Sequence, residues 1–103
     1  MTNAYNTTRT QNVEKMYLRV VVENNPTFII RKDNEVVWEL RKDSEGFNLF
    51  HYGTWILTIR YDGTIRNGYG YSRTDARNIN GLLSLFNIHN VRAHIVNGTL
   101  RID

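Results

Sequence analysis

The segment from Phe47 to Phe86 constrains the fold of this 103-residue chain more than any other part of the sequence. It contains an aromatic-rich strand pattern, an Asp-Gly turn, a short second strand, a Gly/Tyr segment and an amphipathic helix pattern, without a linker between them. This order predicts a β-hairpin that leads directly into a helix packed on a sheet. Because a chain of this length has room for one hydrophobic core, we expect a single domain of the α+β class.

The turn at Asp62-Gly63 decides which side chains of the hairpin share a face. A two-residue turn would place Ile59 opposite Arg66 and bring a charge into the apolar row. A three-residue loop with Gly63 at the bulge position instead pairs Ile59 with Ile65, and we predict this loop. In that register, the face toward the core carries Trp55, Leu57, Ile59, Ile65, Asn67, Tyr69 and Tyr71.

A helix is predicted over about residues 73–87. Its apolar side chains recur at spacings of three and four residues and form one stripe: Ala76, Ile79, Leu82, Leu83 and Phe86. Ser72 or Thr74 can cap the N-terminus of this helix. Asp75 stands three residues after Ser72, which is the spacing of a capping box.

Further strands are predicted on both sides of this segment. Residues 27–31 and 36–40 flank a polar turn, and residues 91–102 alternate around Asn97-Gly98, a strong hairpin signal. Residues 16–22 are apolar and β-branched enough for a strand buried on both faces. The prediction is a mostly antiparallel sheet of about five to seven strands with one amphipathic helix packed on it.

Residues 1–15 show neither the helical nor the strand period. We expect a flexible polar N-terminal arm there, followed by a single α+β domain over residues 16–103. The polar N-terminus lacks the apolar run of a signal peptide, and no segment approaches the roughly 20 apolar residues of a membrane helix. We therefore expect a cytoplasmic protein that does not contact a membrane.

Composition narrows the chemistry further. The chain has no cysteine, which excludes disulfides, thiolate nucleophiles and zinc sites with sulfur ligands. His51, His89 and His94 show no metal-ligand spacing, and no set of Ser, His and Asp stands out, although residues distant in sequence can converge. The predictions are no metal, no cofactor, no catalytic residue and a protein that is not an enzyme.

The net charge of +3 is concentrated in the C-terminal half. Residues 46–103 carry six arginines, three aspartates and no lysine. Arginine pairs bidentately with phosphate and carboxylate groups and stacks on rings, which suits a recognition surface. The candidates for anion or nucleic-acid binding are Arg60, Arg66, Arg73 and Arg77. Arginines scattered over solvent-facing strand positions are the ordinary alternative.

The segment Gly68 to Arg73 follows a strand and opens a helix, where free backbone N–H groups attract anions. It lacks the third glycine of a dinucleotide fingerprint and the Gly-Lys-Ser/Thr of a nucleotide-binding loop. A tight strand-to-helix turn is therefore the favoured interpretation, and an anion cradle is the alternative.

Aromatic residues gather just before the Asp-Gly hairpin. Those predicted to lie in a connection, to be exposed and to anchor a protein interface are Phe47, Phe50, His51 and Tyr52. Aromatic residues interleaved with arginines also resemble the platforms on which single-stranded nucleic acids stack. Trp55, Tyr69 and Tyr71 are assigned to the core instead, because the predicted register points them toward the helix.

A succession of short motifs covers about a third of the chain: Tyr52-Gly53-Thr54, Ile56 to Ile59, Asp62-Gly63-Thr64-Ile65, Tyr71-Ser72-Arg73-Thr74 and Arg77-Asn78-Ile79-Asn80. It resembles short proteins of unknown function encoded by phages and other mobile elements. The chain departs from that pattern at Asn78, where a histidine often precedes the Ile-Asn pair. The resemblance carries no established reaction, and it implies that the protein binds and blocks a host machine, as inhibitors of CRISPR nucleases do.

The leading hypothesis is a non-catalytic phage or mobile-element protein that inhibits a host protein or ribonucleoprotein complex, with a CRISPR-Cas nuclease as the specific target. Its interface would combine the loop aromatics with the C-terminal arginines, and the acidic residues 33–45 would imitate nucleic acid. The alternative is a small nucleic-acid-binding module with an Arg-rich, aromatic surface. A homodimer joined through an exposed sheet edge is a third hypothesis.

Overall fold

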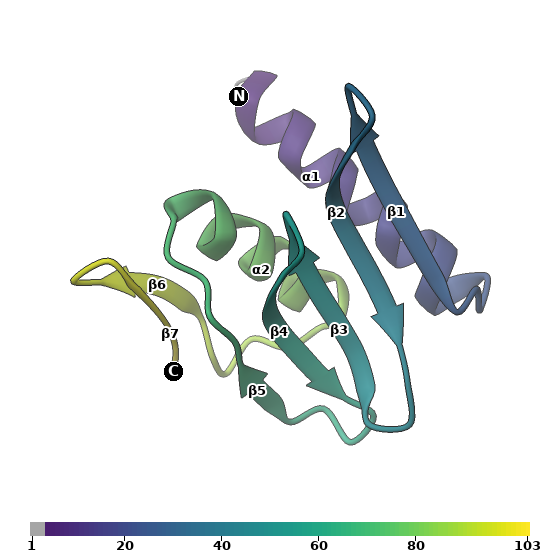
Figure 1. Ribbon diagram of the computed structural model, residues 1–103. Coiled ribbons are helices and arrows are strands. Elements are labelled where there is room, and N and C mark those ends of the chain that lie inside the picture. The colour runs from purple at the N-terminus through teal and green to yellow at the C-terminus, as the bar shows by residue number, and fades with distance from the viewer. Residues whose placement is uncertain (1–3) are drawn as a thin grey trace.

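The computed structural model describes the backbone of residues 4–103 and the side chains from residue 11 onward. Figure 1 shows a sheet with helices on one face and a small hairpin beside them. The helical segments are α1 (Ala4–Tyr17), the π-helical turn η1 (Leu18–Val22) and α2 (Arg73–Leu85). The strands are β1 (Thr27–Lys32), β2 (Glu35–Lys42), β3 (Gly46–His51), β4 (Thr54–Arg60), β5 (Ile65–Asn67), β6 (Ala93–Val96) and β7 (Thr99–Ile102). The predicted α+β class is confirmed.

Tight turns connect most of the strands. β1 to β5 form an antiparallel sheet in chain order, and β6 and β7 form a separate two-stranded sheet. Asp33-Asn34, Tyr52-Gly53 and Asn97-Gly98 each connect two strands with both residues at positive φ. This is the backbone of a type I′ turn, whose twist matches that of the flanking strands. The predicted hairpins over residues 27–40 and 91–102 are therefore confirmed.

The hairpin at Asp62-Gly63 has the predicted bulged loop. Ile59 pairs with Ile65, and the Gly63 N–H donates to the Arg60 carbonyl at 2.9 Å. Gly63 has a φ of 87°, a conformation that glycine adopts without steric cost. Leu57 and Ile59 are buried as expected, because this end of β4 keeps the alternation of the ladder.

β4 also contains a bulge that we did not predict. Leu49 pairs with Leu57 and Phe50 pairs with Trp55, which leaves Ile56 as the extra residue. A bulge interrupts the two-residue alternation of side chains. Trp55 consequently lies on the face away from the helices, and its assignment to the core is wrong.

In the Gly/Tyr segment, the positions that face the core and those that face solvent are the reverse of our prediction. Tyr69 and Tyr71 are 76% and 69% exposed, so their assignment to the core is also wrong. The glycines take the inward positions: a Cβ on Gly68 would lie 2.5 Å from the backbone of Ile56, and one on Gly70 would lie 2.9 Å from Leu100. Only a residue without a Cβ permits such close approach.

The N-terminal region is helical, where we expected an arm and a strand. Residues 4–15 belong to α1, and residues 16–22 continue through its last turn into η1, so the predicted strand is wrong. Val13, Met16 and Val20 follow one another at spacings of three and four residues, and each is no more than 1% exposed. Dividing the chain at residue 15 split this helical stripe, and residues 1–3 lie outside the described part of the chain.

α2 begins with the predicted capping box. The Asp75 N–H donates to the Ser72 hydroxyl, and the Asp75 carboxylate accepts from the Ser72 N–H. The apolar stripe of α2 packs with α1 and the inner sheet face, where the buried core includes Trp38, Leu40, Leu49, Leu57, Ile59, Ile79, Leu82 and Leu83. No helix among the described residues has both the length and the apolar character needed to cross a membrane.

The hairpin β6–β7 lies beside α2 (Figure 1), and one helix side chain attaches it there. The Asn80 amide accepts from the Ala93 N–H at 2.7 Å and donates to the Ala93 carbonyl at 2.9 Å. The Leu100 N–H donates to the Gly70 carbonyl at 2.9 Å. These bonds position the hairpin against both the helix and the turn that precedes it.

Candidate functional site

One face of the five-stranded sheet is covered by the helices, and no other described element covers the opposite face (Figure 1). Strand alternation places a mixture of aromatic, polar and charged side chains on this uncovered face. We define the open face as Glu39, Arg41, Asn48, Phe50, Trp55, Thr58, Arg60 and Arg66.

Two arginines lie over aromatic rings on the open face. The Arg41 guanidinium carbon is 4.7 Å from the centre of the Phe50 ring, and that of Arg66 is 4.8 Å from Trp55. Phe50 and Trp55 are direct partners across β3 and β4, so the rings and guanidinium groups form one row across four strands. Tyr69 extends this row, because its ring meets Trp55 edge-on at 5.6 Å. Guanidinium groups and rings attract each other by about 0.5–1 kcal/mol at exposed sites.

A series of hydrogen bonds attaches the Trp55 ring to the sheet. The Trp55 indole N–H donates to the Thr58 hydroxyl at 2.9 Å, and this hydroxyl donates to the Asn48 amide oxygen at 2.5 Å. The Asn48 amide donates to the Arg41 carbonyl at 3.3 Å. Asn48 and Thr58 are 8% and 1% exposed, so their polar groups are satisfied within the sheet. This series of hydrogen bonds fixes the orientation of the Trp55 ring in the free protein, which lowers the entropy cost of binding a ligand.

The charged side chains of the open face form ion pairs that a charged ligand can replace. Glu45 contacts Arg60 at 3.1 Å and Arg66 at 3.3 Å, and Glu39 contacts Arg41 at 2.9 Å. All three arginine side chains are at least 38% exposed, and exposed ion pairs contribute about 0–1 kcal/mol. A phosphate can therefore take over these guanidinium groups at small cost. Glu39 and Glu45, two of the acidic residues expected to imitate nucleic acid, are therefore already paired with arginines of the same chain.

The structure separates the four predicted arginines into two pairs. Arg60 and Arg66 lie on the open face, whereas Arg73 and Arg77 project from α2 and line a cleft against the β6–β7 hairpin. Sequence analysis missed Arg41 and the polar chain beneath the rings. The alternation of residues 36–42 carries a signal for Arg41, because it puts this side chain on the face opposite to Trp38 and Leu40.

The four predicted interface aromatics do not form one surface. Phe47, Phe50 and His51 belong to β3, so their placement in a connection is wrong, and Tyr52 alone lies in a turn. Phe47 points inward, where its ring centre is 5.2 Å from that of Phe86. Phe50 lies on the open face, and Tyr52 is 54% exposed. Strand alternation divides this group between the two faces of the sheet.

His51 and Asp75 converge from 24 residues apart. His51 Nδ1 donates to the Asp75 carboxylate at 2.6 Å, and Asp75 is 2% exposed. The His51 ring stacks on Trp38 with the ring centres 4.0 Å apart. A carboxylate that orients an imidazole is typical of general-base sites. Among the described residues, no hydroxyl group hydrogen-bonds to His51, and the His51–Asp75 contact joins β3 to α2.

Asp75 also fills the anion position of the Gly/Tyr turn. Its carboxylate accepts from the backbone N–H groups of Tyr71 at 3.0 Å and Ser72 at 3.1 Å. Burial raises the pKa of Asp75, but the hydrogen bonds from His51, Tyr71 and Ser72 outweigh it and leave the pKa below its ordinary value of 3.8. The turn therefore binds the protein's own carboxylate, which agrees with a tight strand-to-helix turn.

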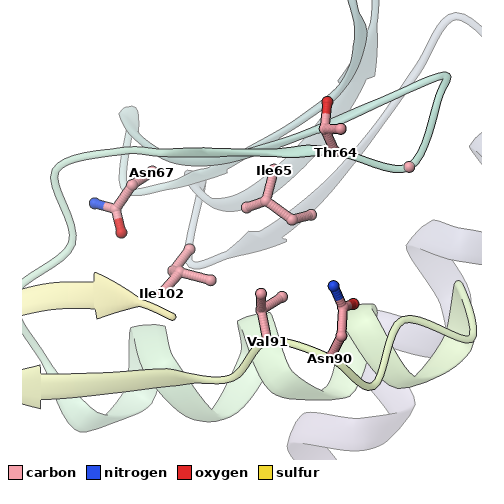
Figure 2. A pocket seen from close by; sticks show the side chains of 7 residues that line it. Thr64, Ile65, Asn67, Asn90, Val91 and Ile102 are labelled. Carbon is pink, nitrogen blue, oxygen red and sulfur yellow. The ribbon is translucent and has the colours of Figure 1, made fainter.

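A separate groove, with a volume of about 290 Å³, lies between β5 and the chain that flanks the β6–β7 hairpin (Figure 2). Ile65, Val91 and Ile102 point into it, and Thr64, Asn67 and Asn90 lie at its rim. None of its lining residues is charged, and it is smaller than most ligand pockets. Across the described residues, no group of three or more His, Cys, Asp or Glu side chains is arranged to hold a metal ion.

Comparison of the chain with family models, with curated proteins and with solved structures finds no match. The functional argument therefore depends on the arrangement of the chain's own residues. Among the described residues, the open face is a surface on which aromatic rings and arginines lie in a single row.

Proposed function

We propose that this protein is a small, non-catalytic nucleic-acid-binding module that holds a single strand on its open face. The observation that carries the proposal is the row of Arg41, Phe50, Trp55 and Arg66, with Tyr69 at its end. Bases stack on aromatic side chains and on guanidinium planes, and each stacked base contributes about 1–3 kcal/mol. Phosphate oxygens would replace Glu39 and Glu45 as partners of the arginines.

A single strand fits this surface better than a duplex does. Phe50 and Trp55 belong to strands β3 and β4 rather than to a projecting helix that could enter a major groove. A duplex keeps its bases stacked on one another, whereas a single strand can place them on protein rings. The low cost of opening the exposed ion pairs favours either kind of nucleic-acid backbone, so the stacking of unpaired bases on the rings is the feature that distinguishes a single strand.

The proposal is tested by fluorescence anisotropy with 3′-labelled strands of about ten nucleotides and matched duplexes. Trp55→Leu should weaken strand binding by roughly 5- to 150-fold, which corresponds to about 1–3 kcal/mol. Binding should weaken steeply as salt rises, and Arg66→Gln should flatten that dependence. Quenching of tryptophan fluorescence by the strand should disappear in Trp55→Leu, since Trp38 is 4% exposed.

Arg19→Gln is the matched control for Arg66→Gln. Arg19 also pairs with a glutamate and lies 5.8 Å from an aromatic ring, that of Phe28, but it belongs to η1 on the helix side of the sheet. Arg19→Gln should bind the strand as the wild type does. If Trp55→Leu binds normally while Arg19→Gln and Arg66→Gln weaken binding equally, the attraction is general charge and the open face is not the site.

A second candidate function is inhibition of a host macromolecular machine, with a CRISPR-Cas nuclease as the specific target that the resemblance implies. The observation that favours it is a set of exposed tyrosines: Tyr52 (54%), Tyr61 (57%), Tyr69 (76%) and Tyr71 (69%). Tyrosine is enriched at protein interfaces and among their hot spots. The phage or mobile-element context belongs to this proposal.

A tagged pull-down from host lysate, with and without nuclease treatment, separates the two functions. A captured nuclease subunit that survives the treatment and is lost in Tyr52→Ala and Tyr71→Ala would favour inhibition. Capture of nucleic acid, with proteins lost after nuclease treatment, would favour the nucleic-acid module. A sizing column tests the homodimer hypothesis, for which β1 at the edge of the sheet is the longest candidate strand.

A further inference from the structure

A cleft between α2 and the start of the β6–β7 hairpin gathers positive charge. Its volume is about 310 Å³, at the lower limit for small-ligand sites. The residues that line it are Arg73, Ala76, Arg77 and Asn80 of α2, together with Arg92, His94 and Ile95. Three of the seven are arginines and none of these lining residues is acidic. We infer that this cleft is a binding site for a phosphate group, of the phosphomonoester class.

The fold brings the basic side chains of the cleft together from two elements. Arg73 and Arg77 are four residues apart on α2, so they share one side of the helix. Arg92 and His94 are two residues apart where the chain becomes extended, so they share one side of the strand. The two hydrogen bonds between Asn80 and Ala93 hold β6 against α2 and set the width of the cleft.

The backbone of Arg92 is fixed by the end of β7. Its N–H donates to the Asp103 carbonyl at 3.1 Å, and the Asp103 N–H donates to the Arg92 carbonyl at 3.2 Å. The guanidinium of Arg92 therefore extends from a constrained position. An arginine on a fixed backbone loses less backbone entropy on binding an anion than an arginine on a mobile segment does.

Two carboxylates close to the cleft in the chain, those of Asp75 and Asp103, have other side-chain partners. Asp75, in the first turn of α2, is turned inward and bonded to His51. Asp103 contacts His94 Nε2 at 3.4 Å and Arg101 at 3.6 Å. Arg73 lies in the first turn of α2, where a cation is unfavourable because of the helix dipole. A bound anion removes this cost.

A phosphomonoester fits this arrangement better than a carboxylate. It carries a charge near −2 and three acceptor oxygens, and it can accept hydrogen bonds from several guanidinium groups at once. The source can be a free nucleotide or the terminal phosphate of a strand, and both present the same group. This inference is independent of the proposed function, because Arg73, Arg77 and Arg92 are not part of the open face.

The experiment uses the full chain and three probes: inorganic phosphate, adenosine 5′-monophosphate with adenosine as its control, and a ten-nucleotide strand with or without a 5′-phosphate. Calorimetry or anisotropy should show at least roughly tenfold tighter binding of the phosphorylated form of a pair, a difference of about 1.4 kcal/mol. Arg92→Gln and Arg73→Gln should each remove that preference. Circular dichroism checks that each variant folds.

Arg31→Gln is the matched control, since it removes the same charge from β1 at the far edge of the sheet. It should leave the preference for the phosphorylated probe intact. Binding of adenosine monophosphate as tight as that of the strand would indicate a free-nucleotide source, and preference shown by the strand alone would indicate a nucleic-acid end. Equal binding of phosphorylated and unphosphorylated probes, or equal losses in Arg31→Gln and Arg92→Gln, would overturn the inference.

The result also separates this site from the open face. Trp55→Leu should weaken both forms of the strand while keeping the preference for the 5′-phosphate. A failure of the open-face proposal would leave strand binding unchanged in Trp55→Leu, and a failure of the cleft would abolish only the phosphate preference. The two proposals can therefore fail independently.

Discussion

The two faces of the five-stranded sheet are built from alternate residues of the same strands, yet they have different physical roles. The covered face presents Trp38, Leu40 and Leu49, each no more than 4% exposed, to α1 and α2. The open face presents rings held by arginines and by a short polar chain. Burial of apolar area stabilises the fold, whereas exposed cation–π and ion pairs contribute little. The core contacts that stabilise the fold and the row on which the proposed binding depends thus lie on opposite sides of one sheet.

The sharpest test of this comparison uses adjacent residues of β3. Leu49→Ala should lower the free energy of unfolding by about 2–5 kcal/mol, because it opens a cavity in the core. Phe50→Ala should cost clearly less, because Phe50 is only half-buried on the open face. Urea unfolding of the two variants measures both effects. Equal losses would show that the open face contributes to stability as much as the core does.

Asp75→Asn should have the next largest effect, a loss of about 1–3 kcal/mol at neutral pH, because it weakens hydrogen bonds to a buried carboxylate. The pKa of Asp75 is lower in the folded chain than its ordinary value of 3.8. Its stabilising contribution is therefore complete above about pH 4 and is lost as pH falls through the folded pKa. Thermal unfolding measured from about pH 2 to about pH 7 should show that Asp75→Asn loses less stability at low pH than the wild type does.

Asp43 and Asp62 also make stability depend on acidic pH, in the wild type and in Asp75→Asn alike. Hydrogen bonds from the Glu45 and Gly46 N–H groups lower the pKa of Asp43, and the Thr64 hydroxyl and N–H lower that of Asp62. Both groups are unchanged in Asp75→Asn, so the difference between variant and wild type isolates Asp75. Identical pH profiles would contradict a stabilising role for the His51–Asp75 pair.

Thr58→Val should reduce stability by about 1–2 kcal/mol, because it leaves the buried Asn48 amide oxygen without its donor. It should also free the Trp55 ring and weaken strand binding, although Thr58 itself is buried. Urea unfolding and strand anisotropy measure the two effects. A stability loss with unchanged binding would mean that the polar chain supports the sheet but does not position the ring.

Gly81→Ala should have the smallest effect, a gain of about 0.5–1 kcal/mol. Gly81 lies inside α2, and an added Cβ would meet Val13 of α1 at 3.9 Å, an ordinary van der Waals distance. The melting temperature should therefore rise, and strand binding should not change. A decrease in stability would show that α1 packs more closely on α2 than this distance allows.

Much of the fold could be predicted because its signals are local. The Asp62-Gly63 loop, the Asn97-Gly98 turn and the Ser72–Asp75 capping box each depend on residues that are neighbours in sequence. Their backbone conformations follow from glycine at positive φ and from short side-chain hydrogen bonds. The α2 stripe is equally local, since its period is visible within thirteen residues.

The wrong predictions concern residues whose positions depend on packing between segments that are distant in sequence. Residues 16–22 have strand propensity, but burial of Val13, Met16 and Val20 against α2 and the sheet favours a helix. The bulge at Ile56 moved Trp55 to the open face, and the close approach of Gly68 to β4 turned Tyr69 outward. No local pattern encodes these choices, because each depends on packing between separate elements.

The candidate sites show the same division. The available chemistry can be read from the sequence: all lysine and arginine positions of the C-terminal half are arginines, aromatic residues are clustered, and cysteine is absent. The partners of these residues could be found only in the folded chain, where Arg66 lies over Trp55, Asp75 contacts His51, and Arg92 lines one cleft with Arg73 and Arg77. The type of a residue is a local property, whereas its partners depend on which apolar surfaces the chain buries together.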